Sequence, residues 1–121
     1  MTTKFDLFVI GGGSGGVRAA RYASSLGINT GLAEGSRLGG TCVNKGCIPK
    51  KLYSFASHYS EELNLMGSFG WKIDKSKFSW NKLVKNKKKE LFRLNSIYEN
   101  LLENANVKIF EDYAEFVDQN T

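Results

Sequence analysis

The chain has 121 residues and a formal net charge of +5, with 41% hydrophobic and 24% charged side chains. This composition excludes a disordered polypeptide and fits one globular domain, with a core large enough that no disulfide-held scaffold is required. No apolar run approaches the roughly 18 residues of a membrane span, and the N-terminus lacks the long apolar core of a signal peptide. We therefore expect a cytoplasmic protein without a membrane partner, where paired cysteines are more often catalytic or metal-binding than structural.

The first predicted elements are a strand, a glycine turn, a helix and a second strand. The apolar run at 4–10 ends in glycines and is typical of a buried strand. Residues 14–27 place helix formers between a serine and a closing glycine, which predicts a helix. Residues 28–34 predict the second strand. Together these elements form a βαβ unit, so we expect a parallel sheet in an α/β fold.

The middle of the chain predicts one irregular helix between two loops. Residues 35–41 are rich in glycine and serine and predict a loop. Residues 42–66 predict a helix with an irregular beginning. Residues 67–80 predict a loop that is anchored by its aromatic side chains.

The last third predicts a long amphipathic helix at 80–104, followed by a strand-like segment at 107–118 that is interrupted at Glu111 and Asp112. Lysines concentrate in residues 81–90, at the start of this helix. We interpret them as a solvated helix face rather than a nucleic-acid site. One apolar stripe runs along the helix: Val84, Leu91, Leu94, Tyr98 and Leu101.

The glycine turn has the spacing Gly11-x-Gly13-x-x-Gly16 directly after the first strand. The first glycine permits a tight turn, the second lets a pyrophosphate approach the backbone, and the third lets helix and strand pack closely. The helix N-terminus then offers N–H groups to phosphates. Glu34 follows Gly16 by 18 residues, where an acid accepts hydrogen bonds from a ribose. The pattern predicts dinucleotide binding.

Cys42 and Cys47 are the two cysteines of the chain, and a structural disulfide explains them poorly. Five residues along a regular helix separate Cα atoms by about 8.6 Å, whereas a disulfide needs roughly 4.4–6.8 Å. A bridge therefore requires a distorted first turn, which Gly46 makes less costly. Because the closed loop is short, the bridge stabilises little. Zinc also fits poorly, because the one histidine, His58, leaves the ligand set incomplete.

A redox role fits the cysteine pair better. A short, strained bridge is easier to reduce than a structural one. The pair lies near a predicted helix N-terminus, with Pro49 where a helix begins. Nearby positive charge is expected to favour the reactive thiolate; it comes from Lys45, Lys50 and Lys51.

The segments "GGGSGG" (11–16) and "GGTCVNKGCIPKK" (39–51) together resemble the flavoprotein disulfide reductases. This resemblance implies a Rossmann-like FAD-binding fold with a redox-active cysteine pair, and NADPH as a second cofactor. It continues through "LNSIYENLLENANVKIFEDYAEFVD" (94–118), so it covers nearly the whole chain. It matches only the N-terminal quarter or so of such an enzyme.

Within that group, "CIPKK" (47–51) resembles the glutathione, trypanothione and large thioredoxin reductases. Arg21 and Tyr98 favour the first of these, because members carry an arginine and a tyrosine there at the glutathione site. The implied reaction is NADPH-dependent reduction of glutathione disulfide. A reductase of another disulfide, or a non-catalytic flavin-binding module, stays open as an alternative. Arg21 as an ordinary exposed residue and Tyr98 as a core aromatic are the structural alternatives.

The resemblance also implies a role for each matching residue. Cys42 is the thiol that attacks glutathione disulfide, and Cys47 is the thiol beside the flavin. The substrate site takes Ser14, Arg21 and Tyr98. Asp112 stands where members usually have glycine. FAD is held by Gly11, Gly13, Ser14, Gly15, Gly16, Glu34, Thr41, Cys42, Lys50 and Ala114.

The resemblance further implies that residues 1–121 are the N-terminal part of an FAD-binding domain, without the NADPH and dimer-interface domains of a homodimeric protein. His58 does not match the family's acid, which comes from the interface domain. The sheet is expected to lack a later strand, so apolar positions of the first two strands should be partly uncovered.

Overall fold

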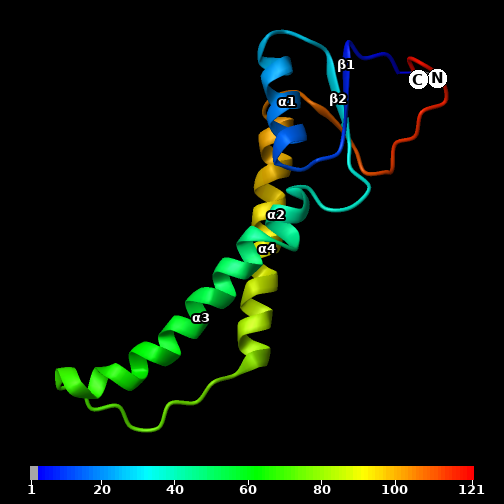
Figure 1. Cartoon of the computed structure of the whole chain (residues 1–121). Coiled ribbons are helices and arrows are strands. Elements are labelled where there is room, and N and C mark those ends of the chain that lie inside the picture. The colour runs from blue at the N-terminus through cyan, green and yellow to red at the C-terminus, as the bar shows by residue number, and fades with distance from the viewer. Residues whose placement is uncertain (1–2) are drawn as a thin grey trace.

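A computed structural model describes residues 3–121 as a three-stranded sheet, helices on one of its faces, and a pair of long helices that extends away from it (Figure 1). The elements in chain order are β1 (Leu7–Ile10), α1 (Ser14–Ser25), β2 (Thr30–Ala33), α2 (Gly40–Asn44), α3 (Cys47–Met66), the 3₁₀ helix η1 (Gly67–Phe69), α4 (Trp80–Glu103) and β3 (Lys108–Phe110).

The sheet has the order β1-β2-β3, and both pairings are parallel. Leu32 in the central strand lies opposite Val9 on one side and Ile109 on the other. The predicted βαβ unit and parallel sheet are therefore confirmed. β1 and β2 are each shorter than predicted, and the helix predicted from 42 begins instead as a separate short helix, α2, before α3.

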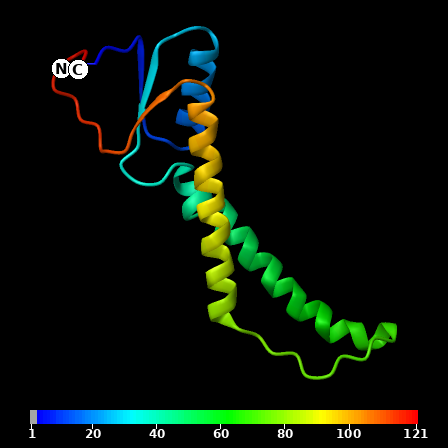
Figure 2. The ribbon, with the colours of Figure 1, turned by 180° about the vertical axis from the view of Figure 1, so that it is seen from behind.

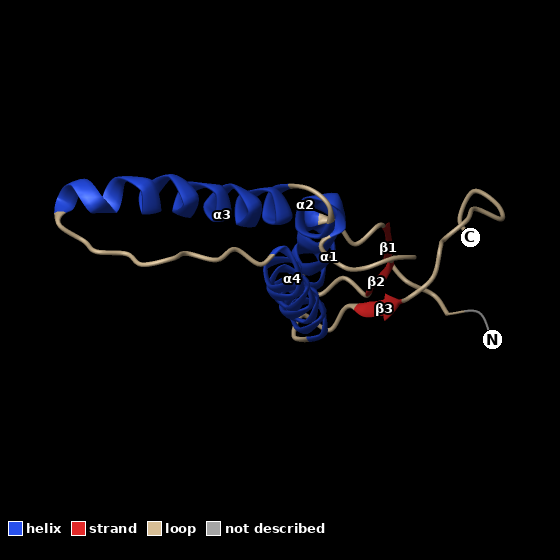
Figure 3. Cartoon of the chain, turned by 90° about the horizontal axis from the view of Figure 1, so that it is seen from below, coloured by secondary structure: helices blue, strands red, loops and turns tan. Residues whose placement is uncertain are grey.

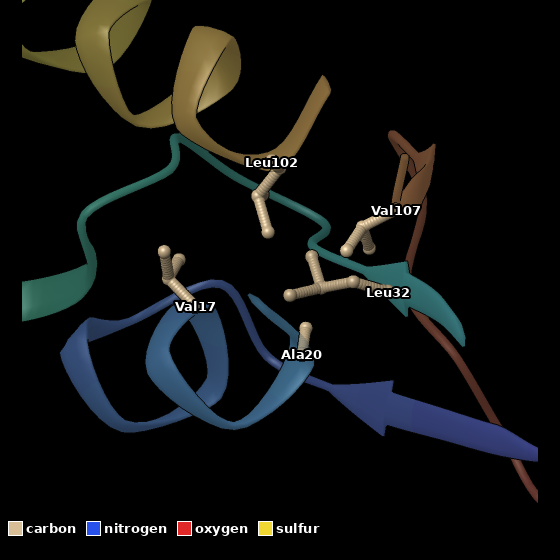
Figure 4. Packing of buried hydrophobic residues seen from close by; sticks show 5 residues of the cluster. All are labelled: Val17, Ala20, Leu32, Leu102 and Val107. Carbon is tan, nitrogen blue, oxygen red and sulfur yellow. The ribbon is translucent and has the colours of Figure 1, made fainter. Parts of the chain in front are cut away.

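The core lies between the sheet and the two helices α1 and α4, which cover the same face (Figure 3). Leu32 and Leu102 are completely buried there. Val9 and Tyr98 pack against the rim of this core. Figure 4 shows its five buried side chains meeting from α1, β2, α4 and the residue before β3: Val17, Ala20, Leu32, Leu102 and Val107.

On the opposite face of the sheet, no helix of residues 3–121 packs (Figure 3). Three aromatic rings cluster there instead, with the Phe8 and Phe110 centroids 5.6 Å apart and Phe5 at 5.4 Å from Phe8. Ile10 is 52% exposed. The expectation of uncovered apolar positions is thus confirmed for β1. It is wrong for β2, which is buried throughout because β1 and β3 flank it.

The helices α3 and α4 diverge beyond α2 and are joined at their far ends by an extended segment (Figures 1 and 2). The prediction that aromatic side chains anchor the segment 67–80 is wrong for three of them, which are exposed: Phe69, Trp71 and Phe78. One aromatic contact forms at its end, where Trp80 stacks on Tyr53 with centroids 5.5 Å apart. Within residues 3–121, no helix is long and apolar enough to cross a membrane.

The segment predicted as strand-like at 107–118 pairs with the sheet only over β3. Beyond the predicted interruption at Glu111 and Asp112, every side chain is exposed. The Asp112 side chain accepts a hydrogen bond from the Tyr113 N–H at 2.8 Å, a local contact that competes with strand pairing. The second half of the predicted strand is therefore a loop.

Candidate functional site

The glycine turn leads from β1 into α1 and uses two of its glycines in the predicted ways. Gly11 has a φ of +103°, which favours glycine. At Gly16 an added Cβ would lie 1.9 Å from the Gly11 carbonyl oxygen, so helix and turn approach too closely for any side chain. Gly15 faces open space. Among residues 3–121, no side chain caps the first turn of α1, so its N–H groups are available to an anion.

Glu34 follows β2 and binds the glycine turn through its carboxylate. One oxygen accepts the Gly12 N–H at 2.8 Å, and the other accepts the Ser36 N–H at 2.9 Å. Gly12 is buried, and a Cβ there would lie 3.0 Å from the Glu34 Cβ. Gly12 lies outside the three spaced glycines, so the fingerprint did not predict its role. Only its position inside "GGGSGG" marked it.

Two hollows adjoin Glu34. The larger has a volume of about 260 Å³ and is bordered by Leu38, Asn95 and Ile109 among others. The smaller, of about 220 Å³, reaches from Glu34 to Thr41 and Lys45. Thr41 and Glu34, both predicted to bind the cofactor, therefore face a common space.

Ala114, the predicted adenine contact, is exposed in the loop after β3. Its neighbour Tyr113 covers Gly35, where a Cβ would lie 2.5 Å from the tyrosine ring. The Glu34 N–H donates to the Phe110 carbonyl oxygen at 3.0 Å. The structure thus brings the start of this loop beside Glu34.

The segment that carries both cysteines, residues 37–47, is called the cysteine loop, and it contacts the glycine turn directly. The Gly39 N–H donates to the Gly12 carbonyl oxygen at 2.8 Å. Gly40 has a φ of +61°, and a Cβ there would lie 2.8 Å from the Gly13 Cα. The two motifs, separate in the sequence, therefore form one backbone-to-backbone contact in space.

The two cysteines lie on either side of a break between α2 and α3. Cys42 is half-buried in α2, and Cys47 is exposed as the first residue of α3; the structure shows both as thiols. Gly46 occupies the break, where a Cβ would lie 3.1 Å from the Thr41 carbonyl oxygen. The predicted distortion at Gly46 is thus present, and it brings the two helix ends together.

The charge environment of Cys42 differs from the prediction. The pKa of the Cys42 thiol is raised, mainly by the hydrogen-bonding interaction with the Cys47 side chain and further by burial. The positive charge of Lys50 acts in the opposite direction, but it is the weaker influence. Lys51 instead lies over the Phe55 ring, 4.8 Å from its centroid. The expected effect of a lysine on the Cys42 thiol is therefore present for Lys50, but in this dithiol state the partner thiol and burial outweigh it, so the net shift opposes the thiolate.

The predicted substrate residues lie on two helices that pack against each other, α1 and α4. Ser14 and Arg21 are exposed on α1. Tyr98 on α4 is half-buried and packs against the core. The predicted alternatives for Arg21 and Tyr98, an exposed helix residue and a core aromatic, thus describe their surroundings in this structure.

A parallel βαβ sheet, a glycine turn with an uncapped helix N-terminus, and an acid at the end of β2 form part of a Rossmann-like α/β fold, here joined to a cysteine pair. The family described as "Pyridine nucleotide-disulphide oxidoreductase" matches residues 5–121. The chain belongs to this family of enzymes.

Three curated relatives carry the name glutathione reductase. The protein of Burkholderia cepacia is 48% identical over 116 residues, which cover 96% of this chain and 26% of the relative. The chloroplastic/mitochondrial protein of Pisum sativum is 45% identical, covering 97% of this chain and 23% of the relative. The protein of Nostoc sp. is 39% identical, covering 100% and 26%. The chain spans about a quarter of the length of these relatives.

Proposed function

We propose that this chain is the FAD-binding, cysteine-bearing part of an enzyme that reduces glutathione disulfide with NADPH. The similarity to proteins named glutathione reductase supports the substrate. The observation that carries the proposal is the contact between the two motifs, in which Gly39 binds Gly12 and Gly40 adjoins Gly13. It joins a nucleotide-binding turn to a pair of thiols.

The residues around the glycine turn fit FAD. A pyrophosphate can approach the uncapped start of α1, because Gly15 leaves open space above the backbone. Glu34 and Thr41 line the hollows where a ribose and the rest of the nucleotide would lie. The positive charge of Lys50 lowers the pKa of the Cys42 thiol, so this lysine acts electrostatically on the cysteine pair. When bound, FAD supplies the two electrons that reopen the cysteine disulfide, having received them from NADPH.

The thiols perform disulfide exchange. The Cys42 thiolate attacks one sulfur of glutathione disulfide, and one glutathione thiolate leaves. The Cys47 thiolate then attacks the Cys42 sulfur of this mixed disulfide, and the second glutathione leaves. Cys42 and Cys47 end as a disulfide, so two electrons have passed to glutathione. The break at Gly46, which brings α2 and the start of α3 together, allows this closure.

Substrate recognition is proposed to involve Ser14, Arg21 and Tyr98. The exposed guanidinium of Arg21 suits a glutathione carboxylate, which it can bind through two parallel hydrogen bonds. The NADPH and dimer-interface domains are proposed to lie outside residues 1–121. These residues alone are therefore expected to show no catalytic reduction of glutathione disulfide. Homodimer formation and a cytoplasmic location of the longer protein stay predictions.

The experiment that tests this chemistry traps the mixed disulfide. The Cys47→Ser variant is treated with glutathione disulfide, and mass spectrometry locates the added glutathione. We expect one glutathione on Cys42 in the variant, whereas the wild type forms the Cys42–Cys47 disulfide without retaining glutathione. A Cys42→Ser, Cys47→Ser variant is the control. If Cys42 stays unmodified in the folded variant, the proposed role of Cys42 is wrong.

A further inference from the structure

Two asparagine side chains hydrogen-bond to the backbone of the turn that precedes Cys42. The Asn95 Nδ2 on α4 donates to the Leu38 carbonyl oxygen at 2.8 Å and to the Asn44 Oδ1 at 2.9 Å. The Asn44 Nδ2 on α2 donates in turn to three carbonyl oxygens of the same turn, at 3.0–3.2 Å: Arg37, Leu38 and Gly40. Two amides thereby bind the cysteine loop to a helix 51 residues away along the chain.

The orientation of the Asn95 amide is determined by its two acceptors. A rotated amide would place an oxygen against the Leu38 carbonyl and the Asn44 Oδ1, and both contacts would be repulsive. In the present orientation, the buried Asn95 Oδ1 has no hydrogen-bond partner in the described part of the chain. Leaving a buried acceptor unsatisfied is unfavourable. The Asn95 amide therefore uses both of its N–H donors on the cysteine loop, while its own oxygen stays without a partner among residues 3–121.

The turn that the two asparagines bind leads into α2 and so determines the position of Cys42. Gly39 and Gly40 have φ values of +98° and +61°, which favour glycine, and this left-handed turn leads directly into α2. Asn44 lies two residues after Cys42 and three before Cys47. Its side chain therefore fixes α2, which carries Cys42, relative to the turn that precedes it. Asn95 lies on α4, three residues before Tyr98, and its bond to Asn44 links α2 to α4.

We propose that Asn44 and Asn95 are positioning residues that set the reduction potential of the Cys42–Cys47 pair. The inference rests on the proposed redox function. By restricting α2, the two amides raise the effective concentration of one thiol at the other and so favour the disulfide. In the exchange concerned, two glutathione thiols are oxidised to glutathione disulfide, while the Cys42–Cys47 bond takes up two electrons and two protons and opens.

The test compares Asn95→Leu with Asn100→Leu, because Asn100 is exposed on the same helix. The 121-residue chain is equilibrated with mixtures of glutathione and glutathione disulfide, quenched by alkylation, and analysed by mass spectrometry. We expect Asn95→Leu to lower the equilibrium constant for forming the Cys42–Cys47 disulfide at least fivefold, which makes the potential about 21 mV less negative. Asn100→Leu should stay within twofold of the wild type. An unchanged constant in folded Asn95→Leu would overturn the inference.

Circular dichroism shows whether each variant is folded. If Asn95→Leu has lost its helices, the comparison passes to Asn95→Ser, whose hydroxyl can serve one of the two acceptors and which predicts an intermediate shift. Loss of the fold in both variants would identify Asn95 as a folding determinant and overturn the positioning role. Failure of the proposed function gives a different result, because the wild type would then form no Cys42–Cys47 disulfide in any glutathione mixture.

Discussion

The backbone N–H of Gly39 donates a 2.8 Å hydrogen bond to the carbonyl oxygen of Gly12. Gly12 in turn donates its own N–H to Glu34, so one residue binds both the cysteine loop and the acid at the end of β2. These hydrogen bonds hold the glycine turn, Glu34 and the start of the cysteine-bearing segment together. A displacement of the glycine turn therefore also displaces the segment that leads to Cys42.

Two neighbouring glycines of the turn should respond very differently to a methyl group. Gly16→Ala places a Cβ 1.9 Å from the Gly11 carbonyl oxygen, so the backbone must move. We expect the free energy of unfolding to fall by about 2 kcal/mol or more. Gly15→Ala meets nothing within 4 Å and should leave stability unchanged or slightly higher. Thermal and urea unfolding of both variants checks this, and equal stabilities would contradict the close packing at Gly16.

The pH dependence of Cys42 reactivity should move in opposite directions in two variants. Cys47→Ala removes the main cause of the raised pKa, so the pKa of Cys42 should fall and alkylation should begin at lower pH. Lys50→Met removes the charge that lowers this pKa, so alkylation should require higher pH. The measurement is the rate of iodoacetamide labelling of Cys42 against pH, resolved by mass spectrometry. Shifts in the same direction would show that another group controls this thiol.

Removing the Glu34 carboxylate should weaken the fold even without cofactor. Glu34→Ala leaves the buried Gly12 N–H without its acceptor, which costs about 1–3 kcal/mol of unfolding free energy. Glu99→Ala is the matched control, because Glu99 borders the same hollow and is exposed. It should change stability by less than about 0.5 kcal/mol. Urea unfolding of both variants provides the comparison, and equal losses would mean that the Gly12 bond contributes nothing.

Arg21 should affect substrate binding in a longer protein that carries this chain and turns over. A charge-assisted contact to a carboxylate is worth about 1.5–3 kcal/mol. Arg21→Ala should therefore raise the KM for glutathione disulfide by roughly tenfold or more, with flavin retained. Arg18→Ala, also exposed on α1, is the control and should leave KM unchanged. If both variants have the KM of the wild type, Arg21 no longer supports glutathione disulfide over other disulfides as the substrate.

Sequence patterns predicted the elements that local rules determine. The βαβ unit, the close approach at Gly16 and the distortion at Gly46 all follow from spacing and glycine geometry. Three features depend on tertiary placement and were not predicted: the bond from Gly12 to Glu34, the asparagine pair, and the raised pKa of Cys42.

The prediction that aromatic side chains anchor residues 67–80 failed for a related reason. Aromatic composition predicts burial only where another surface is available to cover the rings. Phe69 ends η1 and Trp71 follows it, beyond the end of α3, and both side chains are exposed.

The most direct test of the central claim measures FAD binding and its sensitivity to the thiols together. The chain is titrated with FAD, flavin absorbance and fluorescence are recorded, and the Cys42–Cys47 pair is then oxidised or reduced. We predict that FAD binds in preference to NADPH, and that its spectrum changes with the thiol state in the wild type but not in Cys47→Ala. Folded protein that binds no FAD, or bound FAD whose spectrum is indifferent to the thiols, would contradict a single site built from the glycine turn and the cysteine loop.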